Sequence, residues 1–341
     1  MLRRCNALLL VLFSCCLVSL SSQALVQPLP VGMHQLSFRD PLDQQPMQAI
    51  AFYPASAPPG HTEMDLYQVA ASLDAPVAPG HYPLIVLSHG NSGSPLAHHD
   101  LATALAQQGF VVLAVVHPGD NYQDQSRLGT LSNLYGRPLQ LSAAIDAASQ
   151  DPLLGRNLDS ARVGVIGYSA GGESALILAG AHPEPEHLRA YCRQMPEDAD
   201  ACAAQGELVA DRDDLEASAD PRVAAMLLLA PLGLMFDKQE LTEVRVPVLL
   251  YSGDDDQVLA VEHNADALNR SLPRAPDYRV VPGAGHFVFM APCSAQMGRL
   301  VPYLCEDAEG VDRVAIHHQL SADAVAFFRQ ALSRVQASGV D

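Results

Sequence analysis

The sequence has 341 residues, of which 49% are hydrophobic, and its 38 acidic residues outnumber 20 basic ones to give a net charge of −18. A chain of this length with so many apolar residues can bury a large core, which excludes a generally disordered protein. The excess of negative charge argues against nucleic acid as a partner, because such a surface repels phosphate backbones. No segment of roughly 20–50 residues repeats, which argues against solenoids and propellers.

The first 24 residues are typical of a secretory signal peptide. Two arginines precede the apolar stretch Ala7–Leu20, and Ser22-Gln23-Ala24 provides small residues at a cleavage site. The apolar stretch is short for a membrane span, and no later segment approaches the ~20 apolar residues that a span needs. An uncleaved anchor is one alternative, and a lipoprotein signal with Cys15 or Cys16 as the acceptor is another. We therefore expect a periplasmic or secreted protein without a stable membrane span.

The mature chain alternates short apolar runs with Ala-rich helical patterns. Two early runs, Gln35–Arg39 and Gln48–Tyr53, predict an antiparallel lead-in. The later runs predict buried strands at Pro83–Ser88, Phe110–Val116, Arg162–Gly167, Val223–Ala230, Val246–Ser252 and Tyr278–Val281. Helices are predicted at Ala97–Gln108, Leu139–Gln150, Ala170–Ala179 and Val261–Leu272, with a closing helix at Ala322–Val335. Because continuous apolar runs are typical of strands buried on both sides, the sequence predicts an α/β fold with a mostly parallel central sheet covered by helices on both faces.

The loop after the first buried strand has the sequence His89-Gly90-Asn91-Ser92-Gly93. A loop in this position can supply a backbone N–H to an oxyanion, and we nominate the N–H of Asn91. His89 is interpreted as a hydrogen-bonded loop residue rather than a catalytic base. Further along, Asp120 and Tyr122 follow the next strand and are candidates for substrate contact.

The strongest functional signal is Gly167-Tyr168-Ser169-Ala170-Gly171, which matches the G-x-S-x-G pattern. A strand candidate leads into it and a helical pattern follows. A serine on such a strained strand-to-helix turn projects its hydroxyl outward, and only small neighbours permit the turn. The start of the helix adds a positive dipole end where negative charge develops, so the Ala170 N–H is the second predicted oxyanion donor.

A serine nucleophile needs a base and a carboxylate that orients the base. Gly283-Ala284-Gly285-His286 places a histidine in a glycine-rich loop after the last predicted strand. Three aspartates follow the preceding strand, and we assign the role to Asp256, because Val258 and Leu259 would anchor the return of its loop. Asp255 is the alternative. The predicted catalytic residues are therefore Ser169, Asp256 and His286, in the chain order of many hydrolases.

Two segments depart from the strand–helix alternation, about 182–221 and about 292–313, and we interpret both as insertions into a single domain that spans 25–341. The four cysteines outside the signal peptide form two close-set pairs in these insertions, Cys192 with Cys202 and Cys293 with Cys305. An even number in an exported chain favours disulfides, and of the three possible pairings we favour the two local ones. Four free thiols are the alternative. No group of residues has the spacing of a metal site, and no phosphate-binding glycine loop with a lysine occurs, so neither a metal nor a cofactor is expected.

Several of these stretches together resemble a known group of proteins. The matching sequences are P-L-I-V-L-S-H-G-N-S-G, G-F-V-V-L-A-V-V-H-P-G, R-V-G-V-I-G-Y-S-A-G-G-E-S-A-L, G-D-D-D-Q-V and G-A-G-H-F-V-F. From about Gln35 to Phe328 the chain resembles the predicted dienelactone hydrolase and platelet-activating-factor acetylhydrolase branch of the α/β-hydrolases. The resemblance implies the α/β-hydrolase fold and a serine esterase. The chain departs from true dienelactone hydrolases, which carry a cysteine nucleophile at the position of Ser169.

We therefore expect a carboxylic ester hydrolase that forms an acyl-enzyme. Short-acyl esters, including acetylated phospholipids, are the leading substrates, so the expected partner is a small-molecule or lipid ester. A serine peptidase on the same fold and an inert, exported binding protein on a hydrolase scaffold are the alternatives. The oligomeric state stays open.

Overall fold

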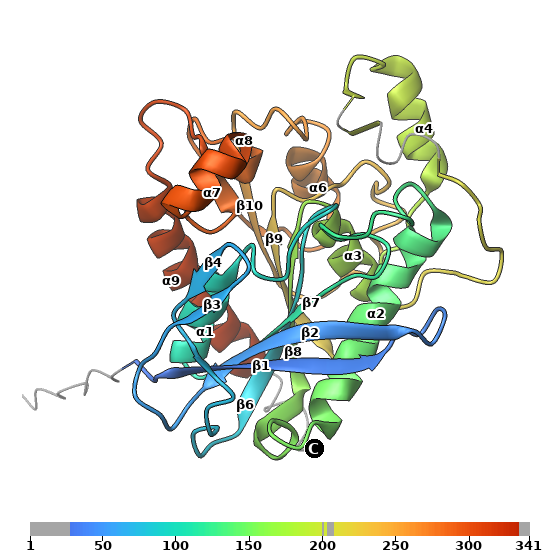
Figure 1. The fold of residues 1–341 in the computed structure, drawn as a ribbon. Helices are drawn as coiled ribbons and strands as arrows, with labels where there is room; N and C mark the ends of the chain where they lie inside the picture. The colour runs from blue at the N-terminus through green and yellow to red at the C-terminus, as the bar shows by residue number, and fades with distance from the viewer. Residues whose placement is uncertain (1–27, 200, 203–207, 334–341) are drawn as a thin grey trace, which may run out of the picture.

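A nine-stranded sheet forms the centre of the molecule (Figure 1). The computed structural model describes residues 28–199, 201–202 and 208–333, so the predicted signal peptide lies outside the described residues. The strands are β1 Val31–Arg39, β2 Pro46–Pro54, β5 Ser72–Leu73, β6 Tyr82–Ser88, β7 Val111–Val115, β8 Leu158–Tyr168, β9 Val223–Leu229, β10 Val248–Gly253 and β11 Asp277–Val281, in the spatial order β11-β10-β9-β8-β6-β7-β2-β1-β5. A separate hairpin consists of β3 Thr62–Met64 and β4 Tyr67–Val69.

Strands β6 to β11 run parallel to one another, whereas β2 pairs antiparallel with both β1 and β7. The mostly parallel sheet and the antiparallel lead-in agree with the predictions from sequence. Side chains of β6 show why its run is uninterrupted: Leu84 and Val86 enter the core on one face of the sheet, and Ile85 and Leu87 enter the core on the other. A strand that is buried on both faces favours apolar side chains at successive positions.

The helices cover both faces of the sheet. They are α1 His99–Gln107, α2 Leu131–Gln150, α3 Ala170–Leu178, α4 Pro185–Gln194, α6 Ala265–Ser271, α7 Ala295–Leu300, α8 Pro302–Cys305 and α9 Arg313–Ser333, with short 3-10 turns η1 Gly155–Asn157 and η2 His286–Phe289. Apolar residues of α2, α3 and α6 pack into the core on one face, and those of α1 and α9 pack into the core on the opposite face. Figure 1 shows this layering, with α1 and α9 on one side of the sheet and α2 and α3 on the other.

Two helices begin earlier than predicted. α2 starts at Leu131 rather than Leu139, because Thr130 caps it by accepting a hydrogen bond from the Asn133 N–H at 3.1 Å, and the helix continues through Pro138. α9 starts at Arg313 rather than Ala322. Its first turns carry polar side chains that are nevertheless buried, such as His317, so the apolar spacing that reveals a helix is missing there.

The two insertions contain helices and both predicted disulfides. Cys192 on α4 is joined to Cys202, and Cys293 is joined to Cys305 at the end of α8, with 5.7 Å between the Cα atoms of each pair. The second disulfide closes a short loop that contains α7 and α8. Within the described ranges, no helix is long and apolar enough to cross a bilayer.

Candidate active site

All the predicted catalytic residues follow strands at the same edge of the sheet. Ser169 follows β8, Asp256 follows β10, His286 follows β11, and the loop of residues 89–93 follows β6. Since these strands are parallel, their carboxyl ends lie along one edge, where open α/β sheets bind ligands.

Ser169 lies on a sharp turn between β8 and α3. Its backbone has φ 54° and ψ −121°, a conformation that is strained for a residue with a side chain. This conformation sharply changes the direction of the Ser169 side chain. The Ser169 carbonyl accepts hydrogen bonds from the N–H groups of Gly172 at 2.8 Å and Leu232 at 3.0 Å, which hold the turn. A Cβ on Gly171 would lie 2.0 Å from the carbonyl oxygen of Ser88, so the close approach of β6 requires glycine there.

Replacement of Gly171 by alanine is therefore expected to lower the free energy of unfolding by about 3 kcal/mol, because the added methyl meets backbone atoms that cannot move independently. Gly298 provides a matched control in α7, since a Cβ there meets nothing within 4 Å. Its replacement by alanine is expected to stabilise the protein by roughly 0.5–1 kcal/mol. Urea unfolding followed by circular dichroism measures both changes, and equal stabilities of the two variants would contradict the prediction.

The structure brings His286 and Asp256 together. The His286 Nδ1 donates to Asp256 Oδ2 at 2.7 Å, and the two side chains are 3% and 2% exposed. The other carboxylate oxygen, Oδ1, accepts from the N–H groups of Val258 at 2.9 Å and Leu259 at 2.8 Å. With its Nδ1 proton held by the carboxylate, the imidazole of His286 keeps Nε2 as the proton acceptor.

The two other aspartates of this loop make different contacts. Asp255 is exposed and accepts a hydrogen bond from the Gln257 side chain at 2.8 Å. Asp254 accepts from the N–H of Gly283 and so ties its own loop to the turn that precedes His286. Neither carboxylate contacts the imidazole of His286.

A cavity of about 510 Å³ opens beside these residues, and both Ser169 and His286 line it. Its walls are mostly apolar, and they include Leu66, Tyr67, Ala97, Tyr168, Ala201, Leu232, Val258, Leu259, Phe287, Met290, Met297, Val301, Tyr303 and Leu304. Segments far apart in the chain contribute to it, among them the β3–β4 hairpin, the loop of residues 89–94 and the α7–α8 segment. The insertion that the second disulfide closes therefore forms one wall of the cavity.

The two predicted oxyanion donors belong to residues near Ser169: Ala170 follows it in the chain, and Asn91 lines the same cavity. Ala170 is the first residue of α3, so its N–H has no acceptor one turn earlier in the helix. Asn91 lines the cavity in a tight turn, in which the Gly93 N–H donates to the Gly90 carbonyl at 3.0 Å. Gly90 lies directly against the nucleophile, since a Cβ on it would be 3.1 Å from the Cβ of Ser169.

Of the two candidates for substrate contact, Tyr122 lines the cavity. Asp120 does not line it; its side chain is fully buried and binds Arg137 and Ser92. Tyr122 therefore stays the candidate of the two, and the place of Asp120 at the end of β7 reveals neither the direction of its side chain nor its partner. His89 is a buried loop residue, as expected, and its Nδ1 donates to the Gly90 carbonyl at 2.7 Å.

Two residues near the site were missed from the sequence. The Tyr168 hydroxyl donates to the His286 carbonyl at 3.3 Å, and its ring lies 5.1 Å from the imidazole, so it supports the loop of the base. Burial raises the pKa of Tyr168 well above its usual value, which keeps this hydroxyl protonated. Its place inside the G-x-S-x-G pattern is a signal that could have identified it. The second residue that was missed is Arg137. It is an isolated arginine in an otherwise uncharged part of α2.

One group of potential metal ligands lies among the described residues. Ligand atoms of His187, Asp237 and Glu240 lie within 4.8 Å of one another. None of the three lines the cavity, so the group is separate from the candidate active site.

Comparisons with known proteins agree with the predicted fold and class. The sequence profile of a family described as platelet-activating factor acetylhydrolase, isoform II, matches residues 61–130. The ferulic acid esterase from Streptomyces cinnamoneus is similar in structure, with a TM-score of 0.65 and 20% sequence identity over 89% of this chain and 91% of that chain. Among curated proteins, none matches the chain. The α/β-hydrolase fold is thus confirmed, and the resemblance to the acetylhydrolase branch is confirmed over residues 61–130; both matches are to carboxylic ester hydrolases.

Proposed function

We propose that this α/β-hydrolase, a carboxylic ester hydrolase by its similarity to known esterases, is a serine esterase that works through an acyl-enzyme. The observation that carries the proposal is the buried hydrogen bond between His286 and Asp256, beside a cavity that Ser169 also lines. Acyl transfer needs a nucleophile, an oriented base and N–H donors for the oxyanion. Ser169 on its strained turn, the imidazole of His286 and the N–H groups of Asn91 and Ala170 are the proposed parts.

In the proposed mechanism, His286 Nε2 takes the proton of the Ser169 hydroxyl while the oxygen attacks the ester carbonyl carbon. The N–H groups of Asn91 and Ala170 hold the oxyanion of the tetrahedral intermediate. His286 then protonates the leaving alcohol as the ester bond breaks, which leaves the acyl group on Ser169. Water, deprotonated by His286, attacks the acyl-enzyme, and the carboxylic acid departs.

Short-acyl esters are the proposed substrates, with acetylated phospholipids among them. A cavity of about 510 Å³ holds more than an acetyl group, so its apolar walls leave room for part of the alcohol. The similarity of residues 61–130 to an acetylhydrolase family supports a small acyl group.

Hydrolysis of p-nitrophenyl esters from acetate to palmitate, combined with labelling by a fluorophosphonate, tests the proposal. We expect turnover of the short esters, loss of activity after labelling, and the phosphonyl group on the peptide that contains Ser169. A label on another serine, or activity that survives complete labelling, would contradict a Ser169 nucleophile. The chain-length profile would give the size of the acyl site.

Two alternatives remain distinguishable in the same assays. A serine peptidase would cleave peptide amides matched to its active esters, whereas we expect negligible amide turnover. An inert binding protein would hydrolyse no ester although folded, and it would not react with the phosphonate.

The proposed active site should also discriminate against anionic substrates. The exposed carboxylate of Asp65 lines the cavity, on a molecule whose net charge is −18. We expect the p-nitrophenyl half-ester of succinate to have a several-fold lower kcat/KM than the butyrate ester, and the difference to shrink in Asp65→Asn and with added salt. Glu63→Gln, in the same hairpin but outside the cavity, is the matched control. Equal rates for the two esters would remove this specificity.

We also propose that the protein acts in the periplasm or outside the cell. The two disulfides support this location, because disulfides persist in oxidising compartments. The signal peptide predicted at residues 1–24 supports it independently.

A further inference from the structure

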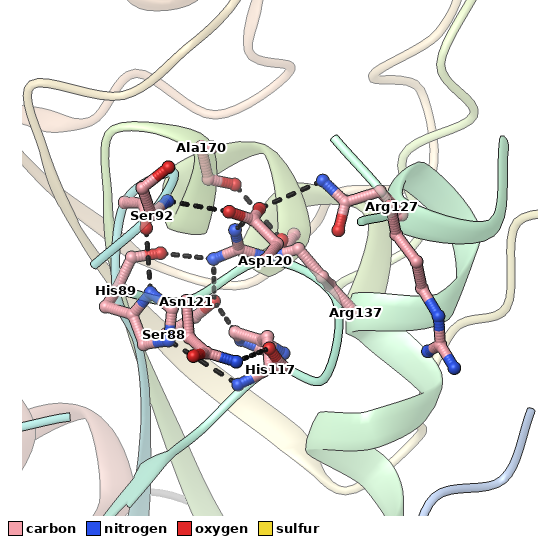
Figure 2. A network of polar contacts seen from close by, with 12 residues as sticks. Ser88, His89, Ser92, His117, Asp120, Asn121, Arg127, Arg137 and Ala170 are labelled. Atoms are coloured by element: carbon pink, nitrogen blue, oxygen red, sulfur yellow. Dashed lines mark hydrogen bonds and ion pairs between the residues drawn. The ribbon is translucent and has the colours of Figure 1, made fainter. Parts of the chain in front are cut away.

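Beneath the loop of residues 89–93 lies a buried network of polar side chains that the proposed mechanism does not use (Figure 2). Its centre is Arg137 of α2, whose side chain is 3% exposed. The guanidinium binds the carboxylate of Asp120, donates to the Ser88 hydroxyl at 3.1 Å, and donates to the backbone carbonyl of His89. One arginine thus connects α2 with the end of β6 and with the loop that follows it.

Asp120 completes the connection from the other side. Its Oδ1 accepts the backbone N–H of Ser92 at 2.7 Å, and its Oδ2 accepts from Arg137 and from the Asn133 side chain at 2.9 Å. The carboxylate is fully buried. Arg137 therefore holds the residue two positions before Asn91, and Asp120 holds the residue directly after it.

The neighbouring histidines are neutral and fix the direction of each hydrogen bond. Burial and the Arg137 charge lower the pKa of His89 to about 4, so its Nδ1 carries the proton that it donates to the Gly90 carbonyl. The same two effects lower the pKa of His117. Its Nδ1 donates to Gln140 at 2.8 Å, and its Nε2 accepts from the Ser88 hydroxyl at 2.9 Å, which leaves the Ser88 oxygen to accept from Arg137.

A buried ion pair of this kind is weak evidence for stability, because the desolvation of two charges offsets much of their attraction. Burial opposes ionisation of Asp120, but Arg137 and the Ser92 N–H together hold the pKa of the carboxyl below its usual value. The pair is therefore charged at neutral pH. What its geometry provides is a rigid support on both sides of one cavity residue, Asn91.

We propose that the Arg137–Asp120 pair positions the oxyanion hole, by fixing the backbone N–H of Asn91 relative to Ser169. This inference rests on the proposed serine esterase function. Arg137 and Asp120 act through the loop and touch no substrate. Their loss should weaken the interaction made in the transition state while substrate binding in the apolar cavity is retained.

The test compares matched variants of two arginine–aspartate pairs that both contact α2. Asp120→Asn and Arg137→Lys alter the network under the loop. Asp220→Asn and Arg222→Lys alter a second pair, in which Arg222 donates to Asp220 at 2.6 Å, and the Asp220 carboxylate accepts from Ser142 of α2 at 2.6 Å. In the described structure, neither member of this second pair contacts residues 89–93.

Four quantities are measured for each variant: kcat and KM for p-nitrophenyl acetate, the inhibition constant of an alkylboronic acid, and the melting temperature. A boronate becomes tetrahedral on the serine and places an oxygen where the oxyanion forms. For Asp120→Asn and Arg137→Lys we expect kcat to fall about 10- to 100-fold, which is less than the loss of a whole oxyanion donor, with KM within about twofold. The inhibition constant of the boronate should rise by the same factor as kcat falls.

The control variants should lower the melting temperature without changing kcat more than about twofold. Equal loss of kcat in both sets would overturn the inference, as would a rise in KM at unchanged kcat. If Asp120→Asn fails to fold, the kcat of Arg137→Lys, which retains the positive charge, decides the test by itself. An inactive wild type, or one that does not react with the fluorophosphonate, would overturn the proposed function itself, whereas an active wild type with unaffected network variants would overturn only this inference.

Discussion

Replacement of Ser169 by alanine is expected to lower kcat for p-nitrophenyl acetate by about a million-fold. The alanine lacks the hydroxyl that forms the acyl-enzyme, and the base and the oxyanion donors then have no nucleophile to act on. Stability should hardly change, since the strained backbone of this turn is held by contacts of the Ser169 carbonyl rather than of its side chain.

Ser149→Ala is the matched control for this loss. Ser149 lies near the end of α2 and its hydroxyl donates only to the Ile145 carbonyl of its own helix, at 2.9 Å. Its replacement should leave kcat unchanged. Thermal unfolding establishes that both variants are folded, and substantial residual activity in folded Ser169→Ala would sink the acyl-enzyme mechanism.

Replacement of Asp256 by asparagine is expected to lower kcat about ten-thousand-fold. Asparagine keeps the oxygen that binds the Val258 and Leu259 N–H groups, so the loop should stay in place. Its amide would, however, donate to Nδ1 of His286. The imidazole proton then moves to Nε2, where the base must accept the proton of Ser169.

Asp255→Asn separates this effect from a change of loop charge. The neighbouring carboxylate is exposed and contacts Gln257, so its conversion to the amide should leave kcat within about twofold. Measurements of kcat across pH 5–9 for both variants decide between the two aspartates. A large loss in Asp255→Asn with little in Asp256→Asn would reverse the assignment.

The strands and the elements of the active-site turn could be predicted because each has a local cause. Runs such as Leu84–Leu87 are apolar because both faces of the sheet are buried, and this appears directly in the sequence. The glycines near Ser169 mark the strained turn for a similar reason: a Cβ on Gly171 would collide with the Ser88 carbonyl of β6, and a Cβ on Gly167 would collide with the Gly171 carbonyl. The two disulfides could be predicted because each joins cysteines that lie only 10 or 12 residues apart in the sequence.

The starts of helices were harder to predict where polar side chains are buried. His317 is a polar residue in the first turns of α9, yet it is buried and forms hydrogen bonds with Asp100 at 2.5 Å and with the Val288 carbonyl at 2.8 Å. Satisfied polar side chains of this kind remove the apolar periodicity on which the prediction of a helix depends.

The sequence by itself determined the class of fold and identified Ser169 as the candidate nucleophile, because a parallel sheet and a strained serine turn impose local patterns on the residues that form them. Only the tertiary structure decided which aspartate meets His286, where Asp120 points, and that Arg137 lies under the loop of Asn91. These contacts join residues 17 to 48 positions apart, and their chemistry depends on burial and on the direction of each donor. Neither property is visible until the segments that create it are packed together.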